Sequence, residues 1–170
     1  MGLTVLDAGV VIAILDASDA HHTAAAAAVT SARERGDSLV LPSSAYAECL
    51  VSPYRRGPEA VTVVDAFVDA LPARVEPVSR AIASAAAELR ARHAGALRLP
   101  DALVIATALV LRADRLLTTD GGWPELPVPV EALRPPSQAK SPPGPASARM
   151  TCREPAGDEL PGAHASNDPG

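Results

Sequence analysis

The stretch "LPDALVIATALVLRADRLLTTDGG", residues 99–122, contains the pattern that decides the fold. Residues 99–113 are apolar on almost every side and carry a proline in the first turn, which predicts a buried helix. The segment "RLLTT", residues 115–119, is typical of a short buried strand. Strands that alternate with helices along a chain predict an α/β fold, with a mostly parallel central sheet covered by helices on both faces.

The same alternation continues toward the N-terminus. Short apolar runs predict strands at "LTVL", residues 3–6, and "SLVLP", residues 38–42. Alanine content, serine caps and apolar spacing at i, i+3 and i+4 predict helices. Those helices are expected at residues 18–35, 43–51, 58–71 and 79–93.

The composition divides the chain into two parts. The chain has 170 residues, of which 48% are hydrophobic, and this is enough for one sizeable core. Residues 135–170 hold 8 of the 17 prolines and 4 of the 11 glycines, and only Met150 and Leu160 are large aliphatic residues. Such a segment buries too little apolar surface to offset its ordering entropy. We therefore expect a domain at residues 1–134 and a disordered tail at residues 135–170.

Several classes of protein do not fit this sequence. No apolar run reaches the roughly 18 residues of a membrane span, and residues 1–14 lack the pattern of a signal peptide, so a cytoplasmic protein is expected. Cys49, in an apolar stretch, and Cys152 are too few for a disulfide framework or a zinc site. The net charge of −5 argues against a protein that coats nucleic acid.

Four carboxylates stand at positions that the predicted fold brings together. Asp7 follows the first strand, and Asp120 follows the strand at residues 115–119. Glu48 lies in the helix after the second strand, and Asp101 opens the buried helix. Ligands of open α/β sheets bind at the carboxyl ends of the strands, near the point where strand order reverses. We therefore expect these four side chains to converge.

Each acid taken alone also has an ordinary structural interpretation. Asp7 can cap the helix that follows it, and Asp101 can complement a helix N-terminus. Asp120, before two glycines, suits a turn, and Glu48 can face solvent from an exposed helix side. The joint occurrence of four such acids is less easily accidental than any one of them.

Clustered carboxylates with no other reactive side chain indicate a metal site. Oxygen ligands suit Mg²⁺ or Mn²⁺, and a bound cation keeps neighbouring carboxylates ionised. A hydrated metal ion can deliver hydroxide to a phosphodiester and neutralise charge on the leaving oxygen, which is nuclease chemistry. The charge count agrees with this interpretation. Residues 1–134 contain 12 arginines and 16 acids, which gives a net charge of −4, and the four candidate acids account for that excess of negative charge.

Four segments resemble the acidic motifs of PIN domains, particularly the VapC-like toxins of bacterial toxin–antitoxin pairs. They are "VLDAGVVIAILD" (residues 5–16), "AYAECLV" (45–51), "LPDALVIATAL" (99–109) and "LLTTDGGW" (116–123), and the resemblance covers about residues 1–133. It implies a three-layer fold with a parallel sheet flanked by helices. It also implies that Asp7, Glu48, Asp101 and Asp120 bind metal and that Thr118 supplies the hydroxyl residue of the last motif.

The resemblance also implies an activity and partners. Members of the family cleave RNA with Mg²⁺, are typically homodimers, and are inhibited by an antitoxin that covers the acidic groove. The sequence departs from the family pattern in two places. Gly9 stands where the family often has serine or asparagine, and Trp123 follows two glycines where an aromatic residue usually comes sooner.

Two other functions are compatible with the predicted fold. An aspartate phosphate-accepting module also uses an acid after the first strand, but it usually needs a lysine, and the only lysine here is Lys140 in the tail. A catalytically inactive PIN-like domain that binds RNA or protein is the second alternative. Metal-dependent RNA hydrolysis would separate that alternative from the nuclease.

Basic and aromatic residues outside the acidic set have two interpretations each. Tyr54, Arg55 and Arg56 could stack a base and hold RNA phosphates, or could form an ordinary solvated loop. Arg90, Arg92 and Arg98 lie on the approach to Asp101, or simply form a charged surface face. His21 and His22 are adjacent and point apart on a helix, so we leave them out of the predicted site.

Overall fold

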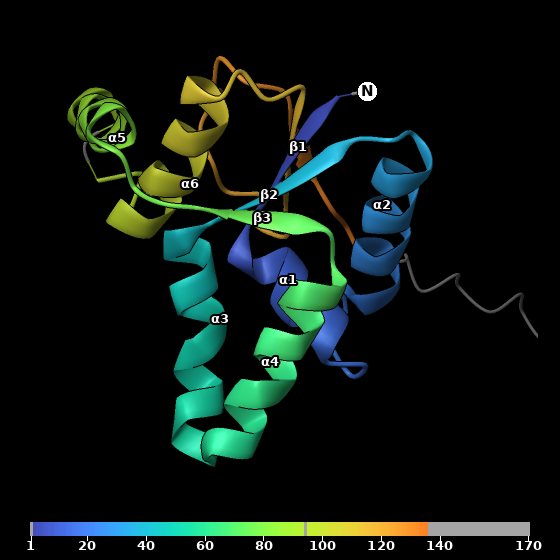
Figure 1. Cartoon of the computed structure of the whole chain (residues 1–170). Coiled ribbons are helices and arrows are strands. Elements are labelled where there is room, and N and C mark those ends of the chain that lie inside the picture. Colours follow the sequence, from blue (N-terminus) through green and yellow to red (C-terminus); the bar gives the residue numbers. More distant parts are fainter. Residues whose placement is uncertain (1, 94, 136–170) are drawn as a thin grey trace, which may run out of the picture. The chain divides into compact units, whose positions relative to one another are not determined.

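Five strands form one sheet in the computed structural model, which describes residues 2–93 and 95–135 (Figure 1). The strands are β1 (Leu3–Leu6), β2 (Ser38–Pro42), β3 (Ala73–Glu76), β4 (Arg115–Thr118) and β5 (Val130–Ala132). Their order is β3-β2-β1-β4-β5, and each neighbouring pair is parallel. The predicted α/β class is confirmed, and the sheet is parallel throughout its described strands.

Helices flank this sheet. In the described part of the chain they are α1 (Ala8–Leu15), α2 (His22–Glu34), α3 (Ser43–Arg56), α4 (Pro58–Ala70), α5 (Arg80–Arg92) and α6 (Leu99–Val110). Helices α3 and α4 run side by side, and α5 packs against α6 (Figure 1). Gly57 joins α3 to α4 with a φ of 117°, a backbone conformation that favours glycine because it has no Cβ.

The centre of the sheet is covered on both faces, as the three-layer prediction requires. Successive residues of a strand point to opposite faces, yet Thr4, Val5 and Leu6 are all buried. The same is true of Leu116 and Leu117 in β4. These strands therefore lie in the middle layer of the hydrophobic core, between helices.

The order of the strands creates a crevice beside β1. Strands β2 and β3 are added in turn on one side of β1. The connection through α5 and α6 then leads to β4 and β5, which lie on the other side of β1. Such a reversal opens a gap between the connections that leave the two central strands at their carboxyl ends. Residues that follow β1 and β4 therefore lie at the mouth of this crevice.

Strands β3 and β5 were not predicted from the sequence. Both are edge strands, and their side chains are half-buried or exposed, with Arg74, Glu76 and Glu131 among them. Charged residues are common on edge strands, which lack the apolar run that marks a central strand.

The predicted tail, residues 135–170, lies outside the described residues apart from Pro135. Within residues 2–93 and 95–135, every helix is too short or too polar to cross a membrane.

Candidate functional site

Asp7 is fixed at the carboxyl end of β1 by bonds on both of its side-chain oxygens. It is the N-cap of α1, where its Oδ1 accepts a hydrogen bond from the Ala8 backbone N–H at 2.7 Å. Its Oδ2 accepts a hydrogen bond from the Thr118 hydroxyl at 2.7 Å. The backbone N–H of Asp7 also donates to the Leu117 carbonyl at 3.0 Å, because β1 and β4 are paired in register. The capping interpretation of Asp7 is thus correct, and the two side-chain bonds hold its carboxylate at the junction of β1 and β4.

Thr118 links Asp7 to the loop that carries Asp120. Its side chain is fully buried, and its hydroxyl oxygen accepts a hydrogen bond from the Asp120 backbone N–H at 3.0 Å. Asp120 Oδ1 in turn accepts from the Gly122 backbone N–H at 2.7 Å. The turn interpretation of Asp120 is therefore correct for one of its two carboxylate oxygens. The exposed carboxylate still lies at the crevice.

Glu48, Asp101 and Asp120 line one cavity of about 440 Å³. Glu48 is exposed on α3, which leaves the end of β2, and Asp101 is half-buried in the first turn of α6. A proline at the start of α6 favours the helical backbone of the first turn, which contains Asp101. The cavity is thus lined by acids from α3, from α6 and from the loop after β4.

The acids influence one another electrostatically. Burial raises the pKa of the Asp7 carboxyl, the bonds from Thr118 and Ala8 lower it, and the charges of Asp101 and Glu48 raise it further. Burial also raises the pKa of Asp101, a backbone bond from Arg98 opposes that shift, and the charge of Asp120 adds to it. Asp7, Glu48, Asp101 and Asp120 therefore form one field of negative charge.

The donor atoms at this edge are all oxygens. Four carboxylates and the Thr118 hydroxyl are the donor types that Mg²⁺ and Mn²⁺ accept, so the residues fit such an ion by their chemistry. In the part of the chain that the structure describes, however, no group of three or more His, Cys, Asp or Glu side chains is arranged closely enough to hold a metal ion. Glu48, Asp101 and Asp120 line one cavity, whereas Asp7 is buried, bonded to Thr118 and not among the residues that line that cavity. The four acids therefore do not form a closed coordination shell.

Three further residues at this edge were not predicted as site residues. Trp123 lines the acidic cavity, as does Arg98, which was considered only as one of three surface arginines. Thr119 lies against Gly9: a Cβ atom built on Gly9 would lie 2.2 Å from the Thr119 hydroxyl oxygen. Gly9, the first departure from the family pattern, therefore leaves the space that the Thr119 side chain fills.

The other residues singled out in the sequence lie outside the acidic cavity. Tyr54, Arg55 and Arg56 are at the end of α3 and are not among the residues that line it. Arg92 pairs with Glu88 on the exposed side of α5. His22 Nδ1 lies 2.9 Å from the Ala13 carbonyl oxygen.

Cys49 is a buried core residue, as the sequence indicates. Burial raises the pKa of its thiol to about 12, with a smaller contribution from the charges of Asp7 and Glu48. A thiol with so high a pKa stays protonated near neutral pH and is a poor nucleophile. We therefore leave Cys49 out of the candidate site.

Comparison with known proteins identifies the family. Residues 4–128 match the model of the PIN domain, and the chain belongs to the PIN domain family. No curated protein sequence matches the chain.

Solved structures of VapC toxins and toxin–antitoxin complexes share the fold. VapC20 of Mycobacterium tuberculosis, a sarcin–ricin loop cleaving toxin, is 22% identical with a TM-score of 0.56, over 69% of this chain and 90% of that one. VapBC2 of Rickettsia felis, bound to a DNA fragment of its promoter, is 13% identical with a TM-score of 0.64, over 77% and 98%. FitAcB of Neisseria gonorrhoeae is 18% identical with a TM-score of 0.56, over 75% and 96%.

Proposed function

We propose that this PIN domain is a metal-dependent endoribonuclease and the toxin of a toxin–antitoxin pair. The observation that carries the proposal is the gathering of acids around one crevice: Glu48, Asp101 and Asp120 line a single cavity, and the pKa of Asp7 responds to two of them. Like charges repel, so carboxylates assembled at the end of a sheet are best explained by a cation that they bind. The likeness to the toxin VapC20 and to a toxin–antitoxin complex of Klebsiella pneumoniae supports the biological role.

Each proposed residue has a definite part in this site. Asp7, Glu48, Asp101 and Asp120 would hold Mg²⁺ or Mn²⁺, and Thr118 would keep Asp7 in position through its hydrogen bond. The bound ion would supply a water of lowered pKa and positive charge at the phosphodiester. Arg98, which lines the cavity, would contact a phosphate of the RNA backbone.

Three partners follow from this proposal. The first is a single-stranded region of RNA, and the second is a cognate antitoxin protein that covers the acidic cavity in the cytoplasm. The third is a second copy of the chain, because the exposed side chains of Ile12 and Val63 line one hollow of about 450 Å³ formed by residues of α1, α3 and α4. Light scattering of the purified protein at micromolar concentration should give the mass of a dimer, and a monomer mass throughout would contradict the third partner.

The decisive variant is Asp101→Asn, which replaces a carboxylate by an amide of nearly the same size and a far poorer ligand for Mg²⁺. We expect cleavage of RNA in Mg²⁺ to be lost while the thermal unfolding temperature stays close to that of the parent. Asp69→Asn, the same change at an exposed position on α4, is the matched control and should cleave like the parent.

The results separate the proposal from its alternative. Parental cleavage by Asp101→Asn would contradict the site, and loss of cleavage in Asp69→Asn would show that the effect is not specific to it. A parent protein that binds RNA but does not cleave it in Mg²⁺ or Mn²⁺ would favour the inactive binding domain.

A further inference from the structure

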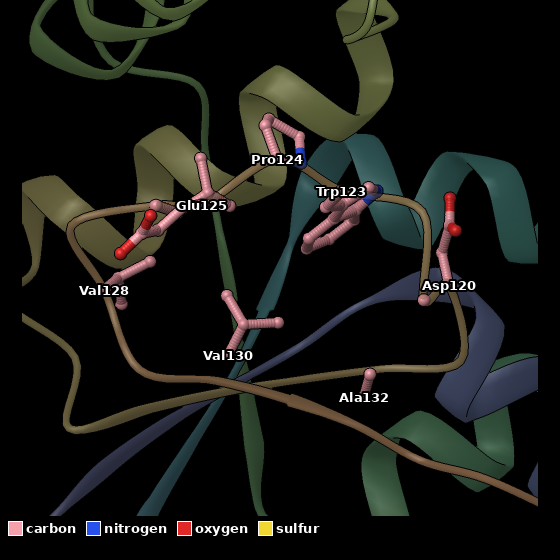
Figure 2. Close-up of a pocket in the computed structure, with 9 residues that line it drawn as sticks. Asp120, Trp123, Pro124, Glu125, Val128, Val130 and Ala132 are labelled. Atoms are coloured by element: carbon pink, nitrogen blue, oxygen red, sulfur yellow. The ribbon is translucent and has the colours of Figure 1, made fainter.

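A second hollow adjoins the acidic cavity. It has a volume of about 250 Å³ and is bounded by the loop between β4 and β5 and by β5 itself (Figure 2). Its apolar wall consists of Trp123, Pro124, Leu126, Val128, Val130 and Ala132. Asp120 and Trp123 line both this hollow and the acidic cavity, so the two spaces meet at these residues.

The wall of this hollow suits a flat ring. An apolar cavity of about 150 Å³ is known to bind benzene, so the larger volume here is sufficient for a larger planar ring. In Figure 2 the Trp123 ring system and the side chains of Val128 and Val130 lie around the same space. Aromatic side chains that flank a polar site provide stacking surface for nucleic-acid bases, because each base has a π face.

The ring of Trp123, and not its indole N–H, is the part available to a ligand in the hollow. Its Nε1 atom is buried and has no hydrogen-bond partner among the residues that the structure describes. Because that atom is closed to solvent, a ligand in the hollow could reach it only if the Trp123 side chain moved. The Trp123 ring itself lines the hollow, and a planar base gains more from stacking on such a ring than an aliphatic side chain does.

We propose that this hollow is a nucleobase subsite, in which a base beside the cleaved phosphate of single-stranded RNA stacks on Trp123. The inference rests on the proposed ribonuclease function and names where part of the substrate binds. The shared residues Asp120 and Trp123 put the hollow next to the place where the phosphate would be held. The carboxylates of Asp120 and Glu125 at its edge disfavour a phosphate inside the hollow and leave the uncharged base as the group that fits.

Fluorescence can test the subsite without any cleavage. Trp123 is the only tryptophan of the chain, so its fluorescence reports on this hollow alone. Uncharged nucleosides added to the full-length protein without metal should quench that fluorescence and saturate in the millimolar range. N-acetylated leucine and phenylalanine amides, which represent side chains of a protein partner, should not. Quenching by these amides and not by nucleosides would overturn the proposal in favour of a protein partner.

A variant that fills the hollow supplies the structural control. Ala132 is exposed on β5 and lines the hollow, so Ala132→Leu adds volume there and leaves Trp123 in place. It should raise the dissociation constant measured by nucleoside quenching by about tenfold, as expected for the loss of one stacked base. Ala70→Leu, at an exposed position on α4, is the matched control and should titrate like the parent. Equal titration of Ala132→Leu and the parent would contradict the subsite.

A cleavage assay distinguishes failure of the subsite from failure of the proposed function. Ala132→Leu should raise KM for an RNA oligonucleotide more than it lowers kcat. An abasic nucleotide beside the cleaved bond should raise KM for the parent by a similar factor and have little further effect on Ala132→Leu. Cleavage in which neither change raises KM would overturn the subsite and leave the ribonuclease intact. Nucleoside quenching in a protein that does not cleave RNA would overturn the proposed ribonuclease function and leave the base-binding subsite.

Discussion

Asp7, at the end of the central strand β1, is held by the protein in a different way from the other three acids of the candidate site. Asp7 is buried at the junction of β1 and β4, and both of its oxygens accept hydrogen bonds from the protein. Glu48 and Asp120 are exposed, and Asp101 is half-buried. Asp7 therefore serves the fold as well as the proposed chemistry, whereas Glu48 can be changed with little cost to the fold. Variants at the two kinds of position should separate stability from activity.

The largest expected difference is between Asp7→Ala and Glu48→Ala. Both should reduce RNA cleavage by more than about a hundredfold, because each removes a proposed metal ligand. Asp7→Ala should also lower the free energy of unfolding, because it removes an N-cap and leaves the Thr118 hydroxyl without its acceptor, which costs about 1–3 kcal/mol. Removal of a buried carboxylate whose pKa is raised offsets part of that loss at neutral pH. Glu48→Ala should stay within about 0.5 kcal/mol of the parent.

Urea unfolding and a cleavage assay on the same preparations measure both quantities for this pair. If Glu48→Ala lowered the free energy of unfolding as much as Asp7→Ala, the proposal that only Asp7 contributes to the stability of the fold would be contradicted. Full cleavage by either variant would remove that residue from the site.

Thr118 tests the hydrogen bond itself. Thr118→Val keeps the size of the side chain but removes the hydroxyl that donates to Asp7 and accepts from the Asp120 N–H. We expect a loss of about 1–3 kcal/mol in the free energy of unfolding, because the buried Asp7 carboxylate loses its donor and the partly buried Asp120 N–H loses its acceptor. Thr118→Ser retains the hydroxyl and should cleave RNA at nearly the parental rate, unlike Thr118→Val. Equal cleavage by the two variants would show that the hydroxyl has no part in positioning Asp7.

The smallest effect is expected where Gly9 meets Thr119. Gly9→Ala places a methyl group against the Thr119 hydroxyl and should cost about 1 kcal/mol of stability. Thr119→Ala in the same chain removes the clash and should restore most of that loss, which a double-mutant cycle measures as a coupling energy. Additive effects of the two substitutions would mean that these positions do not compete for the same space.

The central part of the fold was predictable because its residues are apolar wherever both faces are covered. Strands β1, β2 and β4 have that pattern, and so does α6. The edge strands β3 and β5 carry charged residues and form only because β2 and β4 offer them a partner. No local pattern indicates such a partner.

The candidate site was predictable to the extent that it depends on strand ends. Asp7 and Asp120 follow β1 and β4, and parallel pairing is enough to bring such positions to one edge. The contact of Thr119 with Gly9 depends on how two loops pack across that edge. The position of Trp123 between two hollows depends on the path of the loop from β4 to β5. Neither arrangement has a signature in the residue types or in their spacing.

The bond between Asp7 and Thr118 joins residues that are 111 positions apart. A ribosome makes Asp7 at the start of the domain and Thr118 near its end, so a nascent chain carries the acid long before its partner exists. The crevice beside β1 is completed only when β4 has been synthesised and inserted next to it. A shortened product that ends before β4 would therefore lack Thr118, Asp120 and Trp123 together. Under the proposed function, such an incomplete copy would lack two residues of the site and would be expected not to cleave RNA.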